Sequence, residues 1–185
     1  MEMFALDAEL AQWATALPSL DGAARLPVLL QLCWHLRQRD CARALALAEE
    51  ARRLLPQSGM TPVAQQLVMA RLQLVRAEVQ WLHGALDDAE TLAQAAHAVL
   101  CAHGDGAACF DAHWLLASIA VDRGDHVRNS DQLQTASDLA RRAGDAMRAS
   151  LADAATARWA LPRKSAWSSA SARCARRLKA SSAMS

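Results

Sequence analysis

Residues 29–56 read LLQLCWHLRQRDCARALALAEEARRLLP, an Ala- and Leu-rich segment followed by an Arg-Asp turn and a second segment of the same kind. The pattern returns in residues 73–100 (QLVRAEVQWLHGALDDAETLAQAAHAVL) and in residues 113–143 (HWLLASIAVDRGDHVRNSDQLQTASDLARRA). Such self-similarity indicates a repeat architecture, in which helix pairs bury their apolar faces by stacking on one another. The repeats therefore predict an all-α fold, a solenoid of antiparallel helix pairs.

Turn and capping signals divide the chain into about seven or eight helices. We expect helices over residues 7–17, from just after Gly22 through Leu36, over 41–55, 63–82, 86–100, 107–122 and 127–143, and from Asp145 to near Leu161. The sharpest turn signal is His103-Gly104-Asp105-Gly106, because its two glycines can adopt positive φ. No stretch alternates apolar and polar residues as a half-buried strand would.

The charge of the chain is unevenly distributed. All 19 acidic residues precede Pro162, whereas six of the 20 basic residues follow it, which leaves 14 basic residues and a net charge of −5 before Pro162. We therefore expect a helical-repeat domain over residues 1–161 that does not bind nucleic acid, because phosphate contacts need clustered Lys and Arg. Residues 162–185 form a basic Ser/Ala/Arg-rich tail that we expect to be disordered. Its abrupt composition is also typical of a truncated or frame-shifted reading frame.

The targeting signals favour a cytoplasmic protein. The first ten residues, MEMFALDAEL, are acidic where a signal peptide would be basic, and no apolar run is long enough to span a membrane. Five cysteines lack CxxC spacing and are expected to pack as reduced, small hydrophobic residues.

The helix pairs resemble tetratricopeptide repeats, which carry a small residue in the first helix, a Gly-Asp turn, and alanines where the second helix crosses its neighbours. The matching positions are the small residues Cys33, Ala77 and Ala117, the turns Arg39-Asp40, Gly84-Ala85 and Gly124-Asp125, and the crossing alanines Ala44, Ala48, Ala51, Ala89, Ala93 and Ala96. In the third pair, Asn129 and Leu133 replace the first two alanines and Ala136 keeps the last. The resemblance implies a right-handed solenoid.

The spacing of equivalent positions is longer than the usual repeat of about 34 residues. Ala44 and Ala89 lie 45 residues apart, and Ala77 and Ala117 lie 40 apart. Longer repeats of this kind look like those of maltose-activator-type regulators and of sensory regions in bacterial signalling proteins.

A narrower resemblance covers residues 1–161. The segment 29–55, the Gly-Asp turns and the final ADAATARWAL are similar to the N-terminal region of certain proteobacterial diguanylate cyclases, in which a helical-repeat input module precedes a GGDEF catalytic domain. This chain contains no GGDEF-like signature. The resemblance therefore implies a non-enzymatic signal-input module that binds a protein or peptide and needs no cofactor. The alternatives are a stand-alone adaptor and a homodimerising scaffold.

Candidate partner-binding residues follow from the first helix of each pair, which lines the concave face in repeats of this kind. Aromatic residues recur there and are frequent anchors of protein interfaces, although large aromatic residues also fill gaps between helices as core. The candidates are Trp34, Arg37, Glu78, Trp81, Asp111, Trp114 and Ser118.

A weaker alternative is a zinc-binding helical protein. Two i,i+4 pairs of His and Cys flank the glycine-rich turn, and thiolate with imidazole suits zinc. The spacing matches no known zinc finger, so we expect no metal; the residues that would form the site are His97, Cys101, His103, Cys109 and His113.

Overall fold

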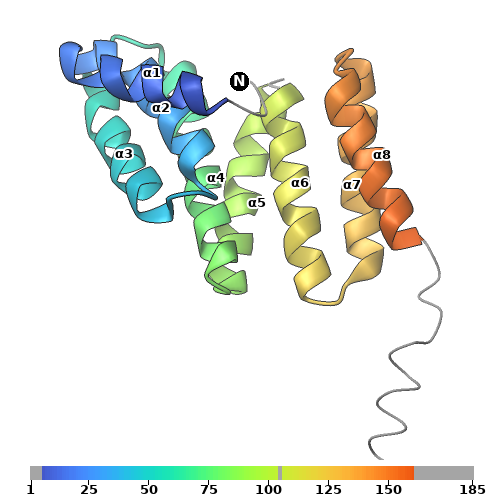
Figure 1. The fold of residues 1–185 in the computed structure, drawn as a ribbon. Helices are drawn as coiled ribbons and strands as arrows, with labels where there is room; N and C mark the ends of the chain where they lie inside the picture. Colours follow the sequence, from blue (N-terminus) through green and yellow to red (C-terminus); the bar gives the residue numbers. More distant parts are fainter. Residues whose placement is uncertain (1–5, 104–105, 161–185) are drawn as a thin grey trace, which may run out of the picture.

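The computed structural model describes residues 6–103 and 106–160, and every regular element in these ranges is helical. The α-helices are α1 (Asp7–Ala16), α2 (Leu26–Leu36), α3 (Cys41–Leu54), α4 (Pro62–Leu82), α5 (Leu86–Ala102), α6 (Gly106–Asp122), α7 (His126–Arg142) and α8 (Ala146–Ala160). Short 3₁₀ turns cover Leu17–Ser19, Gly22–Arg25 and Leu55–Gln57. Each α-helix packs against the next one in the chain, and they follow one another side by side in Figure 1. The all-α prediction is confirmed for the described residues.

The predicted boundaries hold to within a few residues. The largest difference within a described helix is at the start of α2, where residues 22–25 form a 3₁₀ turn before the α-helix begins at Leu26. Pro27 explains the late start, because proline has no N–H to donate and is tolerated in the first helical turn. Leu161 and the tail 162–185, with Cys174, lie outside the described residues.

Three turns between consecutive helices have the same geometry. Gly84, Gly124 and Gly144 adopt φ values of 79°, 76° and 72°, and the next residue in each turn donates a 2.9 Å backbone hydrogen bond to the carbonyl five residues before it. This left-handed conformation is unfavourable for residues that carry a Cβ, which explains the glycine at each turn. Asp125 and Asp145 then cap the following helices by accepting from the backbone N–H three residues later.

Small side chains form the contacts between neighbouring helices. The predicted crossing alanines are all buried, with at most 3% of their surface exposed, and so are the small residues of the first helices: Cys33, Ala44, Ala48, Ala51, Ala77, Ala89, Ala93, Ala96 and Ala117. The replacements Asn129 and Leu133 occupy buried positions of the same kind in α7. Alanines at i, i+4 and i+7 lie on one helix face, so that face allows close approach of the neighbouring helices.

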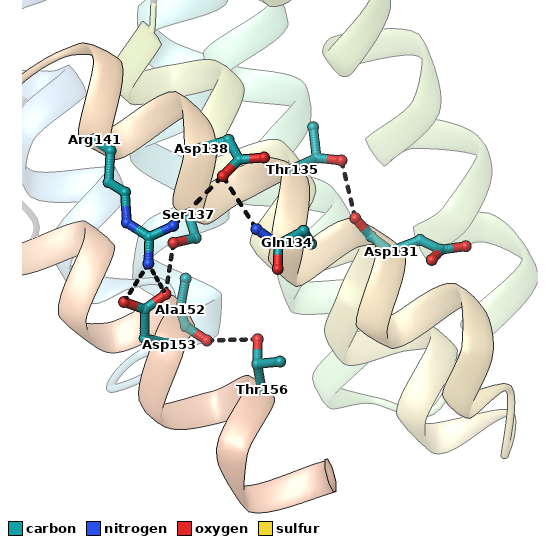
Figure 2. A network of polar contacts seen from close by, with 9 residues as sticks. All are labelled: Asp131, Gln134, Thr135, Ser137, Asp138, Arg141, Ala152, Asp153 and Thr156. Atoms are coloured by element: carbon teal, nitrogen blue, oxygen red, sulfur yellow. Dashed lines mark hydrogen bonds and ion pairs between the residues drawn. The ribbon is translucent and has the colours of Figure 1, made fainter.

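The last two helices are also joined by polar contacts (Figure 2). Arg141 of α7 donates from Nη2 to both carboxylate oxygens of Asp153 of α8, at 2.9 and 2.7 Å, and Ser137 Oγ donates to Asp153 Oδ1 at 2.6 Å. Arg141 and Asp153 are about half exposed, so this ion pair contributes little to stability. Ala152 of α8, in contrast, is fully buried with Phe110, Ala136 and Ala140.

Among the described residues, no helix is long and apolar enough to cross a membrane.

Trp34 belongs to the hydrophobic core, with 4% of its surface exposed. We expect Trp34→Ala to lower the free energy of unfolding by about 3–5 kcal/mol, because the cavity left by a buried aromatic is filled only partly by relaxation. Chemical denaturation measures the loss. Leu82→Ala, at a residue that is 43% exposed, is the control and is expected to change the stability by less than about 1 kcal/mol. Equal losses in the two variants would contradict the assignment of Trp34 to the core.

His35 should make the stability of the fold depend on pH. Burial, with the nearby charges of Arg37 and Arg39, lowers the pKa of His35 from 6.5 to about 4, and within the described chain its Nε2 has no hydrogen-bond partner. Between pH 6.5 and about 4, His35 is therefore protonated in the unfolded chain and neutral in the folded chain. The contribution of neutral His35 to the free energy of unfolding is complete above pH 6.5 and is lost as the pH falls towards 4.

The variant His35→Phe keeps a ring against Trp13, whose centroid lies 5.6 Å from that of His35, and removes the titrating group. Denaturation at pH 7 and pH 5 should show that the wild type loses more stability than the variant on acidification. Identical losses would show that His35 does not carry this pH dependence.

Candidate functional site

Three of the seven candidate partner-binding residues meet at one pocket. Trp81 at the end of α4 and Trp114 and Ser118 of α6 line a pocket of about 160 Å³, together with residues of α7 and α8. Both tryptophans are only partly buried. The remaining lining residues are Ala117, Val121, Asp122, Asn129, Leu133 and Ala155.

Fixed contacts hold the two tryptophans in place. The indole N–H of Trp81 donates to Asp122 Oδ2 at 2.6 Å, which joins α4 to α6. The ring of Trp114 stacks on the buried Phe110, with 6.0 Å between the centroids, and Ser118 Oγ donates to the Trp114 carbonyl at 3.0 Å. The aromatic walls of the pocket are therefore supported before any ligand arrives.

Asn129 is a buried polar residue that lines this pocket. The side chain is 2% exposed, and its Nδ2 donates to the Ala117 carbonyl at 3.0 Å. Its Oδ1 is buried and has no hydrogen-bond partner in the described part of the chain. An unpaired buried amide oxygen costs free energy, which a donor on a ligand can recover.

The other four candidates do not lie at this pocket. Trp34 is in the core, and the Arg37 guanidinium lies 3.6 Å from the centroid of its ring. Arg37 also forms an ion pair with Glu78, and Gln38 donates to the other oxygen of that carboxylate. Trp34 and Glu78 are buried, and the Arg37 side chain is only 14% exposed. The Arg37–Glu78 pair joins the end of α2 to α4.

Asp111 is likewise an internal residue, with 7% of its surface exposed. Its Oδ1 lies 3.5 Å from Nε of Arg148 in α8. Burial raises the pKa of Asp111 to about 6, although the positive charge of Arg148 opposes the shift. Asp111 therefore links α6 to α8 and is buried away from the pocket.

Asp122 and Asn129 line the pocket but were not among the candidates predicted from the sequence. Asn129 carried a signal, because it is a polar residue at a position where the repeat expects a buried alanine. Asp122 carried none, since one acid at the end of a helix is common on solvated surfaces.

Four of the five candidate metal ligands converge on a second site. In the described chain, one ligand atom from each of His97, Cys101, Cys109 and His113 lies within 4.8 Å of those of the other three. Cys101 and Cys109 form a disulfide, with their Cα atoms 5.1 Å apart. Their prediction as free thiols is therefore wrong, whereas Cys33 and Cys41 are free. His103 lies outside the cluster.

The spacing of the cluster is symmetric about the turn between α5 and α6. His97 and Cys101 are four residues apart on α5, and Cys109 and His113 are four apart on α6. Residues at i and i+4 lie on one helix face, and α5 and α6 are neighbours in Figure 1. The hairpin therefore places cysteine opposite cysteine and histidine opposite histidine.

The two imidazoles contact each other directly. Nε2 of His97 lies 3.0 Å from Nε2 of His113, and Nδ1 of His113 lies 2.8 Å from Oε1 of Gln132 in α7. Since Oε1 only accepts, His113 carries its proton on Nδ1 and directs the Nε2 lone pair at the cluster. Burial lowers the pKa of both histidines, which favours their neutral forms.

Comparisons with family models, curated proteins and solved structures find no match to this chain.

Proposed function

We propose that this chain is a non-enzymatic interaction module of tetratricopeptide-like repeats, which binds a segment of a partner protein at the pocket formed by Trp81, Trp114, Ser118 and Asn129. The observation that carries the proposal is this pocket, in which two supported aromatic walls adjoin an unpaired buried acceptor. Tryptophan is enriched among the residues that dominate interface energetics.

The size of the pocket favours a side chain of a protein over a free metabolite. Binding sites for small molecules usually have volumes of about 300–1,000 Å³. The volume here is about 160 Å³ and suits one apolar side chain. A backbone N–H next to that side chain would donate to Asn129 Oδ1 after a small movement of the side chains that cover this oxygen, which would give the ligand both an anchor and an orientation.

Repetition in the fold supports the proposed tetratricopeptide-like arrangement. Polar contacts join the first helices of successive pairs: Arg37 to Glu78 from α2 to α4, Trp81 to Asp122 from α4 to α6, and Asp111 to Arg148 from α6 to α8. Each contact ties one helix pair to the next. A module joined in this way would transmit a change at the pocket along the row of helices.

The resemblance to the N-terminal region of diguanylate cyclases supplies the proposed context, an input module that passes a binding event to an effector domain. This chain has no GGDEF signature, so we expect purified protein supplied with GTP and Mg²⁺ to make no cyclic di-GMP. Chromatographic detection of that product would overturn the non-enzymatic proposal.

Peptide binding tests the proposed site. The full chain is used to select from a phage-displayed library of random peptides, and isothermal titration measures the affinity of the selected peptides. We expect Trp114→Ala to weaken binding by about 30-fold or more, because loss of an aromatic anchor costs about 2 kcal/mol. Ser118→Leu should also weaken it, since the larger side chain fills the pocket while leaving the tryptophans in place.

Met147→Ala is the control, because Met147 is 60% exposed on α8 and does not line the pocket. It should bind the selected peptides as the wild type does. The proposal is wrong if no peptide is enriched, or if the selected peptides bind Ser118→Leu and Trp114→Ala as tightly as the wild type.

A further inference from the structure

We propose that the reduced chain binds one Zn²⁺ ion through Cys101, Cys109, His97 and His113, and that this ion fastens α5 to α6. The site is separate from the peptide pocket and does not depend on the proposed function. It is a structural metal site and excludes the disulfide, since the same two sulfur atoms serve in both.

The disulfide alone does not account for the cluster. A disulfide needs two cysteines and gains nothing from imidazoles, yet two histidines meet beside it with their Nε2 atoms 3.0 Å apart. Two thiolates and two imidazoles are the ligands that tetrahedral zinc prefers, and the four atoms found together in the described chain include no carboxylate. The convergence of all four on one point is the observation that indicates a metal.

The distances fit a tetrahedral ion after a small movement. With Zn–N of about 2.0–2.1 Å and Zn–S of about 2.3 Å, the edges of the tetrahedron are about 3.3 Å between nitrogens and about 3.8 Å between sulfurs. The imidazole nitrogens are already within a few tenths of an ångström of this separation. The sulfurs reach it when the disulfide is broken, because both cysteines lie near helix ends that meet at a turn.

Gln132 of α7 holds one ligand in the orientation that zinc requires. Its Oε1 accepts a hydrogen bond from Nδ1–H of His113, which leaves the Nε2 lone pair available to the metal. Partners of this kind are usual behind metal-bound histidines. His97 donates from Nε2–H to Nε2 of His113 without metal, so its proton would move to Nδ1 when zinc takes the Nε2 lone pair.

The disulfide form is converted to the zinc-bound form in two steps, reduction and metal binding. Reduction of the Cys101–Cys109 disulfide takes two electrons and two protons and gives two thiols. A trialkylphosphine supplies the electrons and is converted with water to its oxide. Binding of Zn²⁺ then releases the two thiol protons, so the bound site holds two thiolates and two neutral imidazoles.

The test uses the full chain, reduced with a water-soluble phosphine and kept under anaerobic conditions. Titration with Zn²⁺ against a chromogenic chelator should show one equivalent bound. Titration with Co²⁺ should give the intense visible bands of tetrahedral cobalt together with thiolate-to-metal charge transfer. The air-oxidised chain, which has the same sequence with the disulfide formed, should show neither.

Variants separate the ligands from their neighbours. Cys101→Ser and His113→Gln should each weaken zinc binding by more than about 100-fold, and Gln132→Leu by about 10–100-fold, as expected when a residue behind a ligand is lost. Two matched controls should bind zinc as the wild type does: His103→Gln, in the same turn but outside the cluster, and Cys41→Ser, at a free thiol elsewhere.

Several results would overturn the proposal. It fails if the reduced wild type binds less than one equivalent of Zn²⁺, or if the oxidised chain binds Zn²⁺ as tightly as the reduced chain. It fails likewise if the Co²⁺ complex shows only the weak visible bands of octahedral coordination. It also fails if folded Cys101→Ser retains the wild-type affinity. Should the variants unfold, the comparison of oxidised and reduced wild type still decides, because it changes no residue.

Discussion

The rest of the structure depends on one constraint: neighbouring helices approach each other closely where their side chains are alanine. The crossing positions of α3 and α5 are alanines with at most 3% of their surface exposed. Such positions cost little helix propensity and bring the helix axes near one another. The larger side chains then pack around them. On α5, His97 and Cys101 meet ligand atoms of α6. On α7, one crossing position holds Asn129, which lines the pocket.

Polar contacts add specificity to this apolar framework. The contacts between the first helices use different chemistry in each case: an Arg–Glu ion pair, an indole–carboxylate hydrogen bond and a buried Asp–Arg pair. Most of these groups are buried or partly buried, so removal of one partner would leave the other without compensation. This internal use accounts for the burial of Glu78 and Asp111, two of the candidate partner-binding residues.

The sequence was sufficient to predict the helices and most of the crossing positions, because periodicity, glycine turns and caps are local signals. It predicted the burial of Ala89, Ala93 and Ala96 for the same reason. It did not predict which first-helix residues face outward. The difference between Trp34 and Trp114 depends on which neighbouring helix covers each ring, and that is a property of packing. The His–Cys cluster was visible as two i,i+4 pairs, but its convergence depends on the pairing of α5 with α6 across the turn.

The most direct measurement of the packing constraint is the stability of Ala93→Leu compared with Ala95→Leu. Both substitutions add three carbons to a residue of α5. Ala93 has no exposed surface, whereas Ala95 is exposed. Chemical denaturation should show Ala93→Leu to be less stable than the wild type by about 1–3 kcal/mol, because the extra volume forces neighbouring helices apart. Ala95→Leu should stay within about 0.5 kcal/mol of the wild type. Equal stability of the two variants would show that close contact at Ala93 does not govern how the helices pack.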